Sequence, residues 1–364
     1  MSIKNDVSID KDIENSKTFE KERYEEAVEQ AYDEKHAEFE KISKEKLVIS
    51  LIGSVNAGKS QTINALTGIK YTEVKARAGW TKDISLFELK KGVFIADTPG
   101  LHDIDESVSN KASNFVEEKS DIVLFFLNAA VGVTRHEKEA YQKVHALGKE
   151  MIVVLNKIDA LDEDDIVEVT EQIKEELNTI PIAISAKKSI GIDKLNEKII
   201  SILEEKGKEL LFLKVSRYKD KTVNNWINGA SVSAAGIGAI PIPGADIVPL
   251  TTLQVGLAMK IAYIYDITPT KSDIMKLVAS TVTGQVGKQA VRWAITALKA
   301  TGWIPGAQLL EVAASAIGAT VAASLTYGFG WACNAYYKSG MTMDLGEVGK
   351  IFENSYEEYK VEKI

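Results

Sequence analysis

Cysteine is almost absent from this sequence: Cys333 is the only one among 364 residues. A lone thiol cannot form an intramolecular disulfide, which excludes a disulfide-stabilised secreted scaffold. The first thirty residues also lack the apolar run that a secretory signal requires, because charged side chains recur throughout them. We therefore expect a cytoplasmic protein.

Proline and glycine are missing between Phe19 and Lys46, so nothing in this stretch breaks a helix. The apolar residues there recur at mostly helical spacing: Phe19, Ala27, Val28, Ala31, Tyr32, Phe39 and Ile42. Their stripe is short and irregular, which favours an exposed helix with one packed face over a coiled coil. We expect residues 1–46 to be a charged helical extension.

No single sign of charge dominates the chain, whose formal net charge is -8. This acidic balance disfavours nucleic acid as a partner. Residues 1–46 carry a net charge of -5 and residues 206–364 one of +4, so the basic excess lies at the C-terminal end. A length of 364 residues exceeds what one compact core usually organises, so we expect more than one domain.

Between residues 47 and 205, apolar stretches alternate with charged helical ones, which is the pattern of a βαβ domain. The expected strands are 47–52, 84–89, 93–97, 121–127, 151–155 and 180–184. The expected helices are 59–67, 107–119, 134–148, 163–177 and 191–205. This order predicts an α/β fold with a doubly wound, mostly parallel six-stranded sheet, and an antiparallel edge hairpin made by 84–89 and 93–97.

The strongest motif is residues 53–60, Gly-Ser-Val-Asn-Ala-Gly-Lys-Ser, between an expected strand and an expected helix. This is the pattern of a phosphate loop (P-loop). Gly53 and Gly58 let the backbone N–H groups face the phosphates of a nucleotide. Lys59 is expected to reach the β- and γ-phosphate oxygens, and Ser60 to offer its hydroxyl to Mg2+.

Three further motifs end expected strands in the same order: Asp97-Thr98-Pro99-Gly100, Asn156-Lys157-Ile158-Asp159 and Ser185-Ala186-Lys187. Ligands bind at the carboxyl ends of strands in open α/β sheets. Asp97 is expected to hold Mg2+ through water, and the Gly100 N–H to contact the γ-phosphate.

The base pocket is expected at the second and third of these motifs. Asp159 can accept from two guanine donors that adenine lacks, so it specifies GTP and GDP over adenine nucleotides. The backbone N–H of Ala186 is expected at guanine O6. Asn156 and Lys157 are expected to brace the pocket.

Over residues 47–205 the chain resembles the Era-like branch of the translation-factor-related GTPases. The resemblance rests on the run from Asp97 to His102 and on residues 78–84, Ala-Gly-Trp-Thr-Lys-Asp-Ile. The second run looks like the switch I signature of these enzymes, with Trp80 in place of a threonine. It implies that Thr81 reaches Mg2+ in the GTP state; Thr72 is the competing choice, without the following Lys-Asp-Ile.

Hydrolysis raises a separate question, because Leu101 occupies the place where Ras-type enzymes carry a water-orienting glutamine. Intrinsic turnover should be slow unless another group, an ion or a second protomer assists. His102 is either a replacement base or an exposed histidine. The Era-like resemblance implies that Asn56 coordinates K+ beside the phosphates. The alternative is that Asn56 only braces the P-loop.

The expected site follows from these motifs. Its nucleotide contacts are Gly53, Ser54, Asn56, Ala57, Gly58, Lys59, Ser60, Gln61, Asn156, Lys157, Asp159, Ser185, Ala186 and Lys187. Its metal ligands are Ser60, Thr81 and Asp97, and its catalytic groups are Asn56, Lys59, Thr81 and Gly100.

Residues 206–364 show no strand alternation and are expected to be helical throughout. Charged side chains are absent from 222–245 and from 312–337, runs long enough for a membrane span. Ile-Pro-Gly-Ala recurs at 242–245 and 304–307, which suggests two helix-turn-helix units with Pro-Gly corners. The segment around 240–249 resembles the YcjF-like bacterial domain of unknown function, a resemblance that names no activity.

Two interpretations of the apolar runs stay open. In a soluble bundle, alanine and glycine serve close helix packing. In a membrane, Gly318 and Ala322 pack inserted helices, and the interface is anchored by Trp226, Trp303 and Trp331. The basic residues that would face anionic headgroups are Lys206, Lys208, Lys214, Arg217, Lys219 and Lys221.

The leading hypothesis is a GTP-binding and GTP-hydrolysing switch. It couples nucleotide state to a helical domain that acts at the cytoplasmic face of the inner membrane or in homo-oligomer assembly. The alternative is a soluble regulatory GTPase that binds a protein partner without membrane contact. No Gly-X-X-Gly loop with basic flanks occurs, so the RNA-binding KH region of Era has no counterpart here and RNA is not expected.

Overall fold

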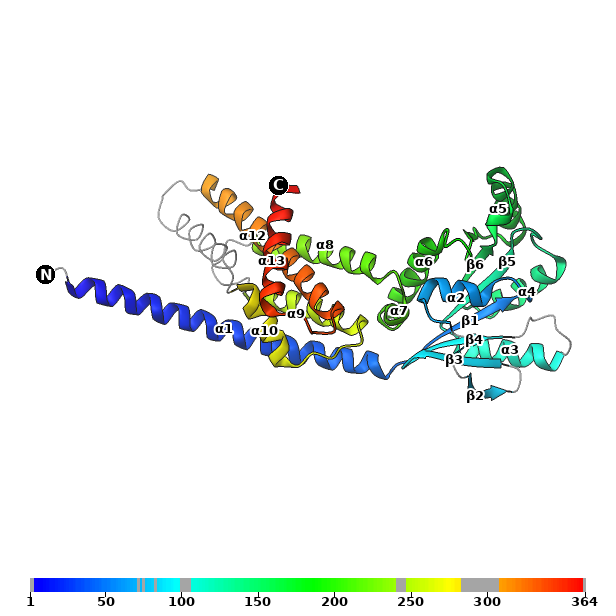
Figure 1. The fold of residues 1–364 in the computed structure, drawn as a ribbon, viewed down its shortest axis with the longest axis horizontal. Coiled ribbons are helices and arrows are strands. Elements are labelled where there is room, and N and C mark those ends of the chain that lie inside the picture. The colour runs from blue at the N-terminus through cyan, green and yellow to red at the C-terminus, as the bar shows by residue number, and fades with distance from the viewer. Residues whose placement is uncertain are drawn as a thin grey trace. The chain divides into compact units, whose positions relative to one another are not determined.

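A computed structural model describes residues 3–70, 73, 76–81, 84–98, 106–239, 247–282 and 308–362. Contacts divide the chain into two compact units (Figure 1). The first, called the sheet unit here, comprises residues 41–220, and the second, the helical unit, combines residues 1–40 with 221–364. The domain limits expected at residues 46 and 205 remain predictions. The contacts divide the chain after Glu40 and after Asp220.

The sheet unit contains a seven-stranded sheet in the order β2-β3-β4-β1-β5-β6-β7. Its strands are β1 (Leu47–Gly53), β2 (Ala76–Thr81), β3 (Ile84–Lys90), β4 (Val93–Asp97), β5 (Ile122–Asn128), β6 (Met151–Asn156) and β7 (Ile182–Ile184). β1 pairs in parallel with β4 and β5, and β3 pairs antiparallel with β4. The predicted α/β class and edge hairpin are confirmed.

The count of strands differs from the prediction of six, because residues 76–81 add an edge strand. Ala76 pairs with Phe87 and Thr81 with Ile84, both antiparallel. The sequence predicts a switch loop here, since Gly79 and a lack of apolar alternation hide the strand. Backbone pairing with β3 supplies the order that the side-chain pattern does not show.

Helices cover both faces of the sheet. They are α2 (Lys59–Thr67), α3 (Glu106–Lys119), α4 (Arg135–His145), α5 (Glu163–Leu177), α6 (Ile192–Glu205) and α7 (Glu209–Val215). Alternate residues of β5, Val123, Phe125 and Leu127, join the core that α3, α4 and α5 close. The residues between them are also buried and point to the other face, so β5 is covered on both sides.

Hydrogen bonds connect the C-terminal part of the sheet unit to the beginning of β1. Lys208 Nζ lies 2.6 Å from Asp121 Oδ1 and 2.8 Å from the carbonyl oxygen of Lys46. Asp121 Oδ2 accepts from the N–H of Val48 at 2.9 Å. Farther along, Arg217 N donates to the carbonyl of Leu66 at 2.9 Å, which connects the approach to α8 with the end of α2.

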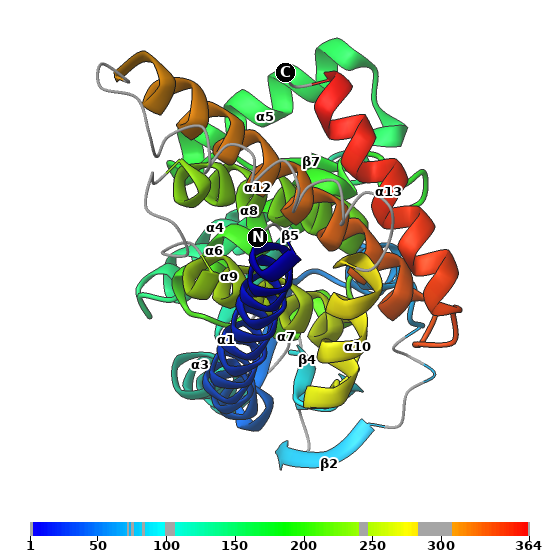
Figure 2. The same cartoon turned by 90° about the vertical axis from the view of Figure 1, so that its left-hand side faces the viewer.

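The helical unit is built from both ends of the chain. Its helices are α1 (Ile3–Lys44), α8 (Lys219–Gly238), α9 (Ile247–Ile264), α10 (Lys271–Val282), α12 (Gln308–Lys338) and α13 (Leu345–Glu362), of which α1 and α8 begin or end just inside the sheet unit. Figures 1 and 2 show α1 beside α9 and α10. The Tyr32 hydroxyl donates to the carbonyl of Pro269 at 2.9 Å, and the rings of Phe39 and Tyr263 lie 5.4 Å apart.

Small residues allow the helices of this unit to approach one another closely. A Cβ atom at Gly238 would lie 2.6 Å from both the Gly318 carbonyl oxygen and the Ala322 Cβ. A Cβ at Gly330 would lie 2.7 Å from Ile227 Cγ1. Glycine at these positions is therefore required by packing between α8 and α12.

Within the described residues, the helices are too short or too polar to cross a membrane. The predicted Pro-Gly corners at 242–245 and 304–307 lie outside the described residues, as does Trp303. The predicted helical character of the C-terminal region is confirmed for the residues that are described.

Candidate functional site

The P-loop follows β1 and ends where α2 begins at Lys59. Gly53 has φ 149° and Gly58 has φ 88°, values that favour glycine. A Cβ at Gly53 would lie 2.7 Å from the carbonyl oxygen of Phe126, and one at Gly58 would overlap the side-chain nitrogen of Asn156. Both glycines are therefore required by backbone conformation and by space. Asn56, with φ 65°, is the left-handed residue between them.

One buried amide connects the P-loop to two other predicted motifs. Asn156 is 1% exposed, and its Nδ2 donates to the carbonyl of Ala57 at 2.9 Å. Its Oδ1 accepts from the N–H of Lys157 at 2.8 Å and from the N–H of Ala186 at 3.1 Å. A bond from Ala186 to guanine O6 would therefore require this N–H to be shared with Asn156.

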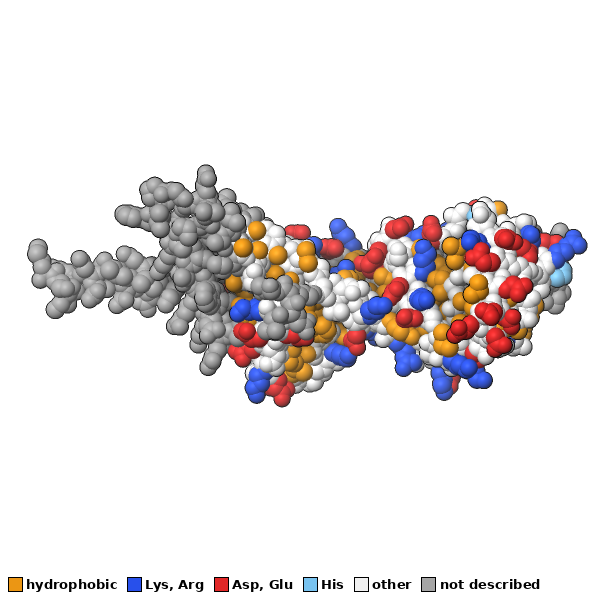
Figure 3. All heavy atoms as spheres, turned by 90° about the horizontal axis from the view of Figure 1, so that it is seen from above, with side chains coloured by type: hydrophobic (Ala, Val, Ile, Leu, Met, Phe, Trp, Pro, Cys, Tyr) orange, Lys and Arg blue, Asp and Glu red, His pale blue; other side chains and the backbone are white. Residues whose placement is uncertain are grey.

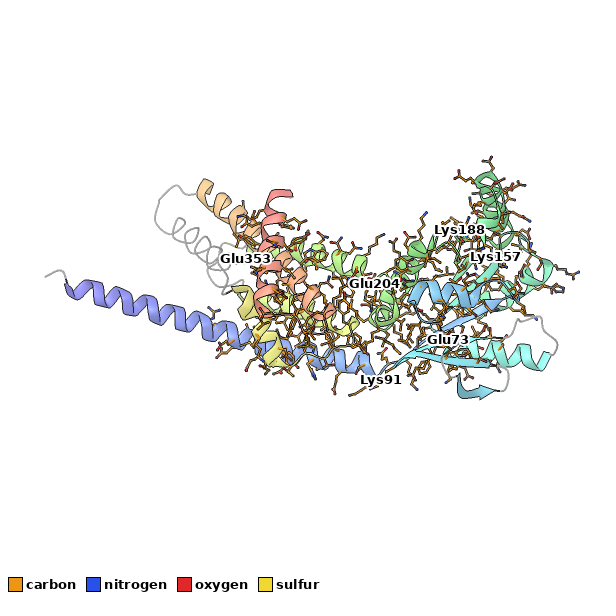
Figure 4. All side chains as sticks on the ribbon, in the orientation of Figure 1. Glu73, Lys91, Lys157, Lys188, Glu204 and Glu353 are labelled. Atoms are coloured by element: carbon orange, nitrogen blue, oxygen red, sulfur yellow. The ribbon has the colours of Figure 1, made fainter. Side chains whose placement is uncertain are left out.

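The predicted base-recognition carboxylate lies beside the third motif. The Ser185 hydroxyl donates to Asp159 Oδ1 at 2.6 Å and accepts from the N–H of Lys188 at 3.1 Å. This hydrogen bond holds the pKa of Asp159 below its ordinary value, so the carboxylate is ionised at neutral pH. Figure 4 shows Lys157 and Lys188 on neighbouring loops at this end of the sheet.

The P-loop lysine lies against its own loop. Lys59 Nζ is 2.8 Å from the carbonyl oxygen of Gly53 and 3.2 Å from that of Ser54. The ammonium is thus held across the concave side of the loop by two backbone acceptors. Its charge therefore lies beside the P-loop, the kind of loop whose N–H groups bind phosphate.

The oxygen donors expected at Mg2+ come from neighbouring elements. Ser60 lies in the first turn of α2, and Asp97 ends β4, where it pairs with Leu51 of β1. The hydroxyl of Thr98 donates to the carbonyl of Leu51 at 2.9 Å, which fixes the chain just after Asp97. A hydroxyl and a carboxylate oxygen are ligands that suit Mg2+, so these residues fit the ion.

Several predicted switch residues cannot be placed. Gly100, Leu101, His102 and Thr72 lie outside the described residues. Thr81 ends β2, and only its backbone is described. Their roles stay predictions.

The sequence reasoning missed Glu137, which lies 6% exposed in the first turn of α4. Its Oε2 accepts from the N–H and the hydroxyl of Thr134, both at 2.9 Å, and closes a capping box. Its Oε1 lies 3.4 Å from the hydroxyl of Ser54 in the P-loop. The Thr-X-X-Glu spacing is visible in the sequence, but its contact with the P-loop is not.

Two family models match separate parts of the chain. Residues 48–157 match the family described as 50S ribosome-binding GTPase, and residues 205–360 match a domain of unknown function, DUF697.

Two relatives illustrate the similarity to known proteins, and each matches less than half of this chain. A probable tRNA modification GTPase MnmE from Cyanidium caldarium is 32% identical over 181 residues, which are 47% of this chain and 38% of that protein. GTPase Era from Halothermothrix orenii is 28% identical over 167 residues, 43% of this chain and 55% of Era. The chain thus spans between about two fifths and just over half of these relatives' lengths.

Among solved structures, Aquifex aeolicus Era bound to GDP and aluminium fluoride is 28% identical to the chain. The match covers 42% of this chain and 55% of that one, with a TM-score of 0.34.

The sheet, the P-loop and the family match together define a P-loop GTPase domain of the kind found in Era, Der and MnmE. Guanine nucleotide is the ligand of this class. The DUF697 match that follows covers most of the chain from α7 to α13.

We expect Glu137→Ala to accelerate GDP release by about fivefold, on the order of 1 kcal/mol, because the P-loop loses the acceptor for Ser54. Stopped-flow release of a fluorescent GDP analogue measures the rate. Thr134→Ala is the matched control, since it breaks the helix cap and leaves the Ser54 contact. If the two variants release GDP equally fast, the effect belongs to the cap. Ser54→Ala should match Glu137→Ala, and the double variant should add nothing further.

Proposed function

We propose that this protein binds and hydrolyses GTP and passes its nucleotide state to the helical unit, which acts at a membrane surface or in self-assembly. The observation that carries this proposal is the buried Asn156 amide, which ties the P-loop to both loops of the expected base pocket. Such an arrangement lets one ligand contact all three loops together.

The phosphates would lie in the P-loop. Backbone N–H groups of residues 53–60 and the N-terminus of α2 attract the β- and γ-phosphate oxygens, and Lys59 neutralises part of their charge. Ser60 and Asp97 hold Mg2+, with Thr81 joining in the GTP state. The ion supplies positive charge to the phosphate oxygens as the terminal phosphoryl group leaves.

The base would lie against Asp159. Its carboxylate is oriented by the hydroxyl of Ser185 and accepts the ring N–H and the exocyclic amine of guanine. With adenine these donors are missing, and the carboxylate would lose its hydrogen bonds. The proposed specificity is therefore for guanine.

Transmission to the helical unit is supported by the chain path. The chain passes between the two units after Glu40 and after Asp220, and both positions lie inside helices, α1 and α8. α1 is followed after two residues by β1, the strand that leads into the P-loop. The approach to α8 is hydrogen-bonded to α2 through Arg217 and Leu66. Movements of β1 or α2 would thus act on both helices.

Membrane contact would involve the basic residues that precede the apolar segment. Of the basic residues that precede the apolar segment, Lys208 is engaged by Asp121. Arg217 and Lys221 are exposed, as a contact with anionic headgroups requires. On the face that Figure 3 shows, acidic and basic side chains of the described residues are interspersed.

We expect Asp159→Asn to shift the nucleotide preference from guanosine toward xanthosine. An amide cannot accept from both guanine donors, but it donates to the xanthine carbonyl. Competition of GTP and xanthosine triphosphate for a fluorescent nucleotide measures the preference. A variant that still prefers GTP as strongly as the parent would show that this loop does not read the base.

Turnover is expected to be faster in potassium than in sodium at equal ionic strength, and Asn56→Ala should remove the difference while GDP binding persists. The Asn56 side chain is exposed, so it is accessible to an ion beside the P-loop. K+ at this place adds positive charge near the transferring phosphoryl group. Phosphate release is measured in dilute and in concentrated protein. Equal rates in both salts would refute the ion role.

The alternative, a soluble switch that binds a protein partner, is separated by flotation of the full chain with anionic liposomes. We expect the floated fraction to differ between GDP and a non-hydrolysable GTP analogue, because the nucleotide changes the helical unit. Neutral liposomes and the Lys59→Ala variant are the controls. Equal, negligible flotation in both nucleotides, with no change of mass in solution, would favour the alternative.

A further inference from the structure

The loop that follows β7 is closed by its own backbone. Ser185 N donates to the carbonyl oxygen of Ile190 at 2.9 Å, and Ile190 N donates to that of Ser185 at 3.1 Å. This pair closes the loop 186–189 beside the expected base pocket. Ser189 within the loop has φ 56°, a left-handed conformation that is uncommon for residues other than glycine. The shape of the loop therefore depends on its two ends staying together.

Two groups expected at the guanine base belong to this closed loop. The hydroxyl of Ser185 donates to Asp159 Oδ1 at 2.6 Å and accepts from the N–H of Lys188 at 3.1 Å. Ser185 is 0% exposed, so these two partners set the direction of its hydroxyl. The second group, the N–H of Ala186, follows directly in the chain. The direction in which Asp159 presents its carboxylate thus depends on the closed loop.

Gly191 lies where the loop ends and α6 begins. It has φ 70°, and a Cβ atom there would overlap the carbonyl oxygen of Ala183 and lie 3.3 Å from Ile184 Cγ2. Both the left-handed backbone and the lack of space require glycine at this position. None of the sequence motifs of the nucleotide site includes this residue.

A side chain at position 191 would have to displace either β7 or the end of the loop. β7 is held by its parallel pairing with β6, in which Ala183 lies opposite Leu155. On the other side, Ile192 in the first turn of α6 is fully buried. Ile190 is 48% exposed and has the least packing to hold it. The displacement would therefore fall on Ile190 and open the loop.

We propose that Gly191 is a positioning residue for guanine recognition: without a side chain at 191 the loop 186–189 closes, and the closed loop holds the Ser185 hydroxyl on Asp159. This inference rests on the proposed function, since it concerns the base pocket of the same site. A carboxylate fixed in this way accepts from the ring N–H and from the exocyclic amine of guanine. Hypoxanthine, the base of inosine, has the ring N–H but lacks the amine. Gly191 therefore contributes to the discrimination between these two bases.

The test compares Gly191→Ala with the parent in the full chain. GDP and inosine diphosphate (IDP) compete for the site with a fluorescent GDP analogue in the presence of Mg2+. We expect the affinity of the variant for GDP to fall about tenfold and its affinity for IDP to change little, because the hydrogen bond that is lost is the one from the exocyclic amine.

Gly207→Ala is the matched control. Gly207 follows the other end of α6 with φ 65°, and a Cβ there would meet nothing within 4 Å. This variant carries similar backbone strain without an overlap, so its ratio of GDP to IDP affinity should equal that of the parent.

Two further variants locate the effect. Ser185→Ala removes the hydroxyl and should lower the same ratio, and adding Gly191→Ala to it should lower the ratio no further. Gly191→Asn is used if the alanine variant does not fold, because asparagine tolerates a left-handed backbone better than alanine. Asparagine brings the same Cβ, so the same loss of discrimination is expected.

Several results would overturn the positioning role. They are a Gly191→Ala chain that keeps the parent's ratio or loses affinity for GDP and IDP equally, and a Gly191→Asn chain with the parent's ratio, which would assign the requirement to the backbone angle alone. If neither variant folds, Gly191 serves the fold and not the base. Failure of the proposed function is distinguishable from all of these: a parent chain that binds GDP no more tightly than IDP would contradict guanine recognition by Asp159 before any variant is compared.

Discussion

The arrangement of the nucleotide loops depends on the side chain of Asn156. All three of its hydrogen bonds are to backbone groups, and they come from the P-loop, from its own loop and from the loop after β7. Inside a protein such hydrogen bonds are individually strong. A buried donor or acceptor that loses its partner destabilises the fold by about 1–3 kcal/mol. Glycine is required at position 58 for the same reason. A side chain there would occupy the space that the Asn156 amide fills. Gly58 and Asn156 are far apart in the sequence, yet the residue type at each position depends on the other.

A second constraint works the same way in the helical unit. Gly238 and Gly318 approach so closely that neither tolerates a side chain, and Gly328 lies against the backbone of Phe352. The abundance of small residues there, which the sequence leaves open to a membrane or a soluble interpretation, has a packing function in the described helices. Close backbone approach is favourable in either solvent, so composition alone cannot distinguish the two.

Much of the sheet unit could be predicted because its signals are local. Six strands and five helices follow from apolar periodicity, and the P-loop from residue types at fixed spacing. β2 could not be predicted, because Ala76–Thr81 has no alternation and is ordered by pairing with β3. Glu137 is recognisable as a capping residue, but its contact with Ser54 joins segments far apart in the chain. The grouping of α1 with the C-terminal helices depends on equally distant contacts, such as Tyr32 with Pro269.

This grouping makes the GTPase domain an insertion within the helical unit, which has a consequence for synthesis on the ribosome. Ala27, Val28 and Ala31 of α1 are buried, and the other helices of this unit follow the GTPase domain in the chain. At ordinary translation rates the delay is on the order of tens of seconds. During that interval the GTPase domain can fold and bind nucleotide, while the apolar side chains of α1 are exposed to solvent. In the nascent chain, α1 therefore lacks its partners in the helical unit until the segment after residue 220 has been synthesised.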